Sequence, residues 1–579
     1  MRGPLASGSP RAAILTRGMG LRRVSATAVA LFVTIATVAG CGGSSHKQTR
    51  TSGGSTRPAT TTTKSTTAAV KGLATADDYA EPAINIDRLR VTIYDLRRSG
   101  PFVILDFGAV CVQPANDTCA TGLAFTPSEH ERGVNASAGS VIPDRSAGVY
   151  LVDPTASKEY RPVADRLGRA DTSLLPHEQP VGSTPVLAWA KFPAPPASVT
   201  SLDVVFPNGG PQISSIPISS GAAHTPTSVA AAQPAPGAYP ADSTTTTGLT
   251  LPVVNLQATV GNPNGNDVES PGRSTITLRS DVLFHFDKSN LTSAAQAILA
   301  GVADRIKARA VGTVTVTGYT DSIGTDAVNI PLSQARAASV VAALRPQVAG
   351  AKVTFQATGQ GSADPVAPNT NPDGSDNPAG RARNRRVTIS FAAKTLAPPA
   401  PPAPASPQQT APATSRTATF TVPSLSGNQT STYQVTVGQL VRDGAVAVLH
   451  LTVTCQATTP PTRSGCDSGS DLGGTPTIPP IPPYQNINQG GNSLRTASGF
   501  YLIDPASGTQ YIPFYDADGV PLASPVPGSL PVGSGGYPVG SSYPVWVYYP
   551  APPANVTSVT VALLEHRMQV AGVPLTNGG

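Results

Sequence analysis

Five cysteines carry the most reactive side chains of this 579-residue chain. They are Cys41, Cys111, Cys119, Cys455 and Cys466. Apart from Cys41 they form two close pairs. In an oxidising compartment the simplest arrangement is one disulfide within each pair, Cys111–Cys119 and Cys455–Cys466. No histidine accompanies either pair at the spacing of a zinc site, so the pattern predicts disulfides and no metal ion.

The segment before Cys41 predicts export. Arg22 and Arg23 precede an apolar run over residues 26–38, which is too short to cross a bilayer comfortably. The run ends in Val38-Ala39-Gly40-Cys41, which resembles the bacterial lipobox. That resemblance implies a signal peptide at residues 1–40 and a lipid on the Cys41 thiol, which would anchor the chain to a membrane.

Two alternatives remain open at this end of the chain. Cys41 could be an unmodified cysteine after an ordinary signal peptide, and Met19 could be the true start. Residues 41–81 are rich in Ser and Thr and predict a flexible tether. A coil of that length spans roughly 35 Å on average. The membrane would be either the outer membrane or the outer face of the plasma membrane.

Charge and motif content exclude several function classes. The formal charge is +6, but five arginines and no acid lie within residues 1–40, so the remainder is nearly neutral. The basic balance therefore does not predict nucleic-acid binding. The chain has no Gly-x-Ser-x-Gly elbow, HExxH motif or P-loop, and no dinucleotide fingerprint beside a suitable strand. We therefore expect no enzyme, no catalytic residue and no cofactor.

Two outer segments, residues 82–209 and 417–574, read as copies of one domain. Gly148–Pro154 (GVYLVDP) matches Gly499–Pro505 (GFYLIDP), and FPAPPASVTSL matches YPAPPANVTSV further on. The only two tryptophans fall at equivalent positions, and each copy has its cysteine pair upstream. Short alternating apolar runs separated by turn residues predict an immunoglobulin-like β-sandwich for each copy.

The segments between the domains have linker composition. Residues 210–271 are rich in Pro, Ala, Thr and Gly, and residues 397–416 are dominated by Pro and Ala. Both predict disordered linkers. The expected fold is therefore multidomain, with a central α/β domain over residues 272–396 flanked by two duplicated β-sandwiches.

The central domain has a different periodicity from its neighbours. Residues 292–309 place apolar side chains on one helical face, and Thr292 is a candidate cap. A second helix is predicted over 331–345, with Pro331 in its first turn. The strand-like runs are 282–286, 313–319, 352–359 and 386–391. This β-α-β-α-β-β order predicts helices on one face of a sheet.

Five motifs in order carry a specific resemblance. They are Phe286-Asp287-Lys288-Ser289, Val316-Thr317-Gly318-Tyr319-Thr320-Asp321, Leu332-Ser333-Gln334-Ala335-Arg336-Ala337, Gly359-Gln360-Gly361 and Gly380-Arg381-Ala382-Arg383-Asn384-Arg385-Arg386-Val387. The series resembles the OmpA C-terminal family, which includes Pal lipoproteins and MotB-type proteins. The resemblance covers about a fifth of the chain.

The resemblance implies non-covalent binding of the diaminopimelate in the peptidoglycan stem peptide. The family's aspartate and arginine fall on Asp321 and Arg336. The first would accept hydrogen bonds from the ligand ammonium and the second would bind its carboxylate. Asn329 matches an asparagine that lines the pocket, and Asn384 and Arg385 match its far wall.

The chain departs from the family pattern at a few positions. Tyr319 stands where a histidine is usual, and Val328 replaces a tyrosine and so removes a hydroxyl near the pocket. The loop over residues 362–379 is longer than in short family members. These departures bear on specificity at the pocket.

The leading hypothesis is a lipid-anchored envelope protein that tethers a membrane to peptidoglycan. The alternative is an adhesion or interaction lipoprotein, in which the duplicated sandwiches bind an envelope protein partner and the central domain only localises them.

Overall fold

The computed structural model describes the following parts of the chain: residues 72–80, 87–113, 118–119, 148–166, 170–172, 179–180, 185–206, 210–220, 246–262, 265–270, 272–371, 373–394, 416–423, 430–461, 466, 497–516, 521–524, 539–563 and 568–578. The predicted signal peptide, Cys41 and the linker residues 397–415 lie outside these ranges. No helix within the described ranges has both the length and the apolar character needed to cross a membrane.

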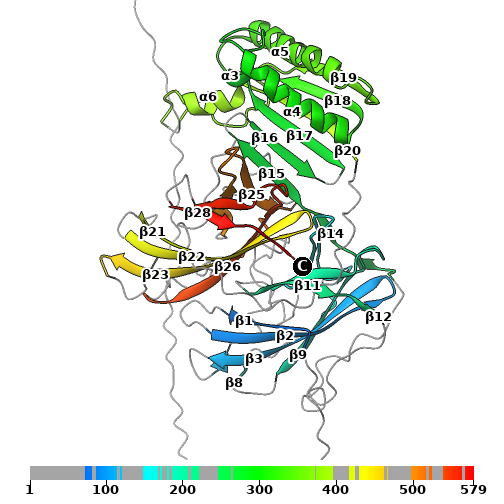
Figure 1. Ribbon diagram of the computed structural model, residues 1–579, viewed down its shortest axis with the longest axis vertical. Helices are drawn as coiled ribbons and strands as arrows, with labels where there is room; N and C mark the ends of the chain where they lie inside the picture. The colour runs from blue at the N-terminus through cyan, green and yellow to red at the C-terminus, as the bar shows by residue number, and fades with distance from the viewer. Residues whose placement is uncertain are drawn as a thin grey trace, which may run out of the picture. The chain divides into compact units, whose positions relative to one another are not determined.

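The central domain is a mixed sheet with two long helices on one face. Its strands run in the order β19 (Val353–Gly359), β18 (Ala310–Gly318), β20 (Arg386–Ala393) and β17 (Arg273–Arg279). β18 is parallel to β19 and antiparallel to β20. Helices α4 (Ser293–Arg309) and α5 (Asp326–Gln347) lie against this sheet in Figure 1, and their apolar side chains share one buried cluster with those of the strands. The expected α/β architecture is confirmed.

Local interactions explain where these helices begin. The Thr292 hydroxyl accepts a hydrogen bond from the Ala295 amide at 3.1 Å, so Thr292 caps α4 as predicted. The predicted start of the second helix is wrong: α5 begins at Asp326, and Pro331 lies inside it. An acid in the first turn favours the helix dipole, and Pro331 costs the helix one backbone hydrogen bond.

The first strand of the central domain also differs from the prediction. Residues 282–286 do not form a strand, because α3 covers Ser280–Leu283 and Phe286 is exposed. The strand is β17, whose side chains alternate between buried and partly exposed positions. Its Thr-Ile-Thr-Leu pattern has the two-residue period of a half-buried strand, which the run over 282–286 lacks.

The two outer copies share one topology, in two antiparallel sheets each. The first sheet of the first repeat is β1 (Ala74–Ala80), β2 (Asp87–Ser99), β3 (Phe102–Gln113) and β9 (Val186–Pro193), and that of the second repeat is β21 (Arg416–Pro423), β22 (Thr430–Asp443), β23 (Val446–Thr459) and β26 (Ser542–Pro550). In each repeat a short strand, β12 (Ser219–Ser220) or β29 (Thr576–Asn577), pairs in parallel with the second strand. β1 thus lies before the predicted domain boundary at residue 82.

The second sheets correspond in the same way. The first repeat has β11 (Gln212–Pro217), β10 (Ser201–Val205), β5 (Tyr150–Asp153), β6 (Lys158–Tyr160) and β14 (Val253–Asn255), and the second has β28 (Met568–Pro574), β27 (Ser558–Leu563), β24 (Phe500–Ile503), β25 (Gln510–Tyr515) and β15 (Gln257–Asn262). The two sheets of each repeat share one buried hydrophobic cluster. The immunoglobulin-like class itself stays a prediction.

The remaining elements are short. They are the pairs β4 (Thr118–Cys119) with β8 (Gln179–Pro180) and β7 (Ala164–Asp165) with β13 (Leu249–Thr250), the strand β16 (Gly265–Ser270), and the 3-10 turn η2 (Ala497–Gly499). α6 (Pro378–Asn384) precedes β20 in the central domain.

Residues 210–271 were predicted as a disordered linker, and their described part is largely strand. β14 adds to the second sheet of the first repeat, and β15, which directly follows it, adds to that of the second repeat. β16 then pairs with both β15 and β17, so hydrogen bonds continue into the central domain. Open sheet edges accept such strands through backbone groups alone, which composition does not reveal.

In each repeat, an arginine binds the turn that contains the repeated Pro-Pro motif. In the first repeat Arg98 donates hydrogen bonds to the carbonyl oxygens of Pro195, Pro196 and Val199 at 2.7, 3.4 and 3.3 Å. In the second, Arg442 donates to Pro552, Pro553 and Val556 at 3.1, 3.0 and 2.9 Å. Each guanidinium thereby fixes the turn that follows the last strand of the first sheet.

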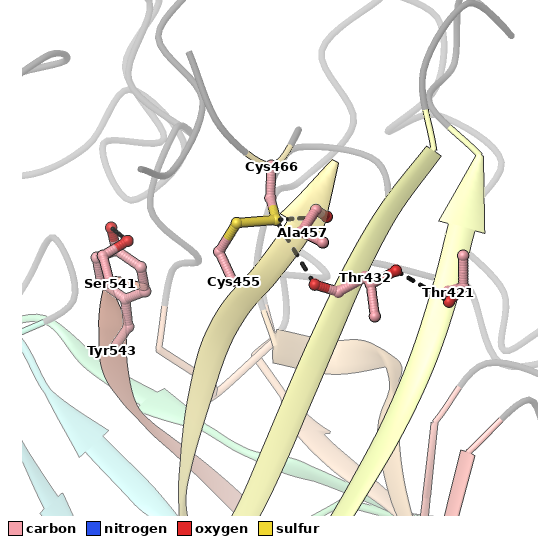
Figure 2. The surroundings of a disulfide bond; sticks show 7 residues. All are labelled: Thr421, Thr432, Cys455, Ala457, Cys466, Ser541 and Tyr543. Carbon is pink, nitrogen blue, oxygen red and sulfur yellow. Dashed lines mark hydrogen bonds between the residues drawn. A yellow bond between two sulfur atoms is a disulfide. The ribbon is translucent and has the colours of Figure 1, made fainter. Parts of the chain in front are cut away.

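The disulfide Cys455–Cys466 is confirmed (Figure 2). Both cysteines are buried at the end of β23, where the Cys466 sulfur lies 3.7 Å from the Thr432 oxygen and 3.6 Å from the Ala457 oxygen. A disulfide sulfur has no hydrogen to donate, so we treat these as close contacts. Cys111 is also disulfide-bonded, while the side chain of its expected partner, Cys119, lies outside the described residues.

A buried polar cluster joins the two repeats. The Asp203 carboxylate accepts hydrogen bonds from the Tyr548 hydroxyl at 2.6 Å and from the Gln212 amide at 3.2 Å. Nearby, the Trp546 indole N–H donates to the Gly210 oxygen at 2.8 Å. Apolar side chains of both repeats are buried together around these bonds. Tyr548 and Trp546 belong to the second repeat, so the contact is between the copies.

We predict that Arg442→Ala lowers the free energy of unfolding by about 2 kcal/mol, because hydrogen bonds from a charged donor are lost and carbonyl groups are left unpaired. Urea unfolding of the full chain measures the loss. Arg416→Ala is the control, since Arg416 makes one exposed hydrogen bond to the Ala571 oxygen. Equal stability of the Arg442 and Arg416 variants would contradict the proposed role of Arg442 in fixing this turn.

We also predict a pH dependence that Asp203→Asn removes. Burial, with the nearby charge of Asp443, raises the Asp203 pKa to about 7, while Tyr548 opposes this by donating to the carboxylate. Because the folded chain holds this proton more tightly than the unfolded chain, the carboxyl stabilises the fold at low pH. That contribution to stability is lost as the pH rises from 4 to 7. Between pH 4 and pH 7, the free energy of unfolding of Asp203→Asn should therefore rise relative to that of wild type by up to roughly 4 kcal/mol.

The measurement is urea unfolding followed by tryptophan fluorescence at pH 4.5 and pH 8. Only the difference between the two proteins is informative, because burial lowers the His450 pKa to about 4 and this works in the opposite direction. A difference that does not change with pH would show that Asp203 is not a buried carboxyl at this contact.

Candidate functional site

Asp321 follows the end of β18 and is only 8% exposed. One carboxylate oxygen accepts the Ile323 backbone N–H at 3.0 Å. The other accepts Arg385 Nη1 at 2.7 Å and lies 3.7 Å from Arg381 Nε. The carboxylate is therefore held in one orientation, and its first oxygen still has capacity to accept a further donor.

Arg336 projects from α5 and is 4% exposed. Its Nε donates to the Lys288 oxygen at 3.1 Å, and its guanidinium lies 5.4 Å from the Phe284 ring centre. Among the described residues no carboxylate lies within ion-pair distance of it, and neither Nη atom has a protein hydrogen-bond partner. The two Nη groups are thus free to bind a carboxylate from outside the chain.

Charges around Arg336 nonetheless make one cluster. Burial lowers the Arg336 pKa, and the carboxylates of Asp287, Asp281 and Asp321 act to raise it. Arg385 lowers it further, as expected for a second cation nearby. Asp321 and Arg336, predicted from the sequence to act together, therefore lie in the same cluster without pairing directly.

Two glycines allow α5 to approach the strand ends closely. A Cβ on Gly318 would lie 2.2 Å from the Ser333 oxygen, and one on Gly359 would lie 2.3 Å from the Gln334 amide nitrogen. These glycines face each other across β18 and β19. No side chain fits at either position, so the glycines of two predicted motifs set the place of α5 relative to Asp321.

Asn329 is buried and shapes the loop after Asp321. Its side-chain amide donates to the Ile323 oxygen at 3.1 Å. The loop's own amides at Ser322 and Ile323 bond to Asn369 and Asp321. These two backbone N–H groups are therefore already engaged within the domain.

Asn384 uses its side chain to hold the long polar loop. Its oxygen accepts the amides of Val366 and Ala367 at 2.8 and 3.0 Å, and its nitrogen donates to the Ala367 and Asn369 oxygens at 2.9 Å each. Four hydrogen bonds satisfy the amide, so Asn384 supports the wall of the site rather than offering a group to a ligand.

Tyr319 and Val328, the two departures from the family pattern, have different surroundings. The Arg386 guanidinium lies 3.7 Å from the centre of the Tyr319 ring, so the tyrosine has a packing partner there. Val328, in the first turn of α5, is 60% exposed, and Ile323, in the loop between Asp321 and α5, is 63% exposed. The site is therefore bordered by exposed apolar side chains.

One site residue was missed by the sequence reasoning. Asp281 of α3 accepts two hydrogen bonds from Arg385, at 2.9 and 2.8 Å. Nothing in the sequence near residue 281 indicates a contact with residue 385. The weak signal was an acid shortly before the Phe286-Asp287 motif. No group of three or more His, Cys, Asp or Glu residues in the described ranges is arranged to hold a metal ion.

Residues 283–378 match the OmpA family, and this part of the chain is an OmpA-like domain.

The chain is similar over part of its length to several known proteins. It is 42% identical over 119 residues to photosystem I P700 chlorophyll a apoprotein A2 of Gloeobacter violaceus, 38% over 122 residues to outer membrane protein A of Bordetella avium, and 41% over 109 residues to peptidoglycan-binding protein ArfA of Mycobacterium tuberculosis. These alignments cover 21%, 21% and 19% of this chain, and 14%, 59% and 31% of the respective relatives. Each alignment therefore covers about a fifth of this chain and less than two thirds of the relative's length.

We predict that Asn384→Ala releases the loop over residues 364–371. The substitution leaves the Val366 and Ala367 amides without their acceptor, and a buried unpaired group costs about 1–3 kcal/mol. Hydrogen exchange of these amides should become at least about tenfold faster. Asn371→Ala, which removes only exposed hydrogen bonds, serves as the control. Unchanged exchange in Asn384→Ala would contradict the role.

Proposed function

We propose that the OmpA-like domain binds peptidoglycan non-covalently in the cell envelope, through the diaminopimelate of the stem peptide. The observation that carries the proposal is Arg336, a buried guanidinium with two unpartnered Nη groups close to the oriented carboxylate of Asp321. Asp287, Asp281 and Asp321 offset part of the cost of burying this cation, and a ligand carboxylate bound directly by the Nη groups would offset more of it.

The chemistry of diaminopimelate suits the pair. The free end of this amino acid carries an ammonium and a carboxylate on one carbon. Arg336 would donate two parallel hydrogen bonds to the carboxylate, and Asp321 would accept from the ammonium. A lysine side chain in the same place would offer only the ammonium. The pair therefore favours diaminopimelate over lysine, without any covalent step.

The proposal extends to the whole chain as a membrane-to-wall tether. Cys41 would carry the lipid, residues 42–71 would bridge part of the distance, and the OmpA-like domain would hold the wall. Support comes from the lipobox resemblance and from the family of the domain. The repeats would then serve as a scaffold beside the wall-binding domain.

We predict that Asp321→Ala and Arg336→Ala each reduce binding to purified diaminopimelate-type peptidoglycan by at least about tenfold, the value of one lost charge-assisted hydrogen bond. Co-sedimentation of the full chain measures this. Arg345→Ala, at the exposed end of α5, is the charge-matched control and should bind as wild type. Retained binding in both site variants, with their melting temperatures unchanged, would refute the site.

A further inference from the structure

Arg385 is held between two carboxylates. Its Nε and Nη2 donate to the two oxygens of Asp281 at 2.9 and 2.8 Å, and its Nη1 donates to Asp321 at 2.7 Å. The bidentate pair with Asp281 occupies one edge of the guanidinium, so only the remaining nitrogen is presented to Asp321. The planar fork of arginine makes this orientation specific.

Backbone contacts directly before Asp281 also hold it close to Arg385. The Ser280 amide donates to the Arg385 carbonyl at 2.9 Å, and Arg279 pairs with Arg386 in the ladder between β17 and β20. α3 therefore begins directly against the residue that Asp281 binds. Asp281 meets Arg385 through strand pairing and a side-chain clamp together, although the two lie 104 positions apart.

The clamp also balances charge beside Arg336. Arg385 lowers the pKa of Arg336, while Asp281 acts to raise it. The hydrogen bonds that Arg385 donates to Asp281 are the largest cause of the raised pKa of Arg385. Without Asp281, Arg385 would be a cation with one carboxylate left, and it would compete with a ligand ammonium for Asp321.

We propose that Asp281 is a positioning residue of the binding site: by clamping Arg385, it keeps the Asp321 carboxylate oriented and available to a ligand ammonium. Asp281 does not itself touch the ligand in this account. The inference rests on the proposed binding of diaminopimelate by Asp321 and Arg336, and it assigns Asp281 to the ammonium side of that site.

The test compares two stem tripeptides on the full chain by calorimetry, L-Ala–D-Glu–meso-diaminopimelate and L-Ala–D-Glu–L-Lys. Both offer an ammonium, and only the first offers the additional carboxylate. Asp281→Asn should lower the affinity for each peptide by about tenfold and leave the ratio of the two affinities unchanged, because only the ammonium side of the site is affected. Arg336→Ala should instead remove most of the preference for the diaminopimelate peptide over the lysine peptide. Asp281→Glu, which keeps the carboxylate, should restore binding to within about threefold of wild type.

Asp304→Asn is the matched control. Within the described ranges Asp304 has Lys307 as its one ion-pair partner, on the surface of α4, so the same change there should leave both affinities unaltered. Melting temperatures show whether Asp281→Asn folds, and a misfolded site would lose the ratio as well as the affinity.

The outcomes separate the two proposals. Loss of binding in Asp321→Ala with normal binding of both peptides in Asp281→Asn would overturn the positioning role alone. A loss confined to the diaminopimelate peptide would also overturn it, by moving Asp281 to the carboxylate side. No binding by the wild-type chain would overturn the proposed function, and this role with it.

Discussion

The close approach of α5 to the ends of β18 and β19 is the constraint on which the site depends. Gly318 and Gly359 admit the helix backbone where any side chain would collide with it. Arg336 lies one turn beyond the point of contact, and Asp321 lies just beyond the end of β18. Their separation is therefore set by backbone packing, which is stiffer than a pair of long side chains.

The sequence predicted which residues lie together here better than it predicted their contacts. Motif order identified Asp321 and Arg336, and the structure brings both into one charge cluster. Asn384 was expected at the pocket wall, and its side chain makes all four of its hydrogen bonds to the adjoining loop. Asp281 was missed because its partner is distant in sequence, and a carboxylate in a short helix has no local signature of such a contact.

The same limit applies to the fold. The duplication was readable because equivalent turns need equivalent residues, such as the Asp-Pro turns at Asp153 and Asp504. The Arg98 and Arg442 hydrogen bonds that hold the Pro-Pro turns were seen only in the structure. Helix periodicity likewise located α4 and α5, with an error at the Pro331 end. The segment that supplies β14 and β15 was mistaken for a linker. Strand addition at an edge depends on backbone hydrogen bonds to a distant partner, and a Pro- and Gly-rich composition conceals it.

Arginines of this domain differ in how their charge is met, and Arg336 differs from the arginines of α4. On α4, Arg305 and Arg309 have side chains 41% and 19% exposed, and both pair with Glu269 of β16. Arg336 is far more buried and has no such pair among the described residues. A guanidinium needed only for stability would be cheaper to pair or to replace with an apolar side chain. Keeping it unpaired beside an oriented carboxylate makes sense where the missing partner arrives with a ligand.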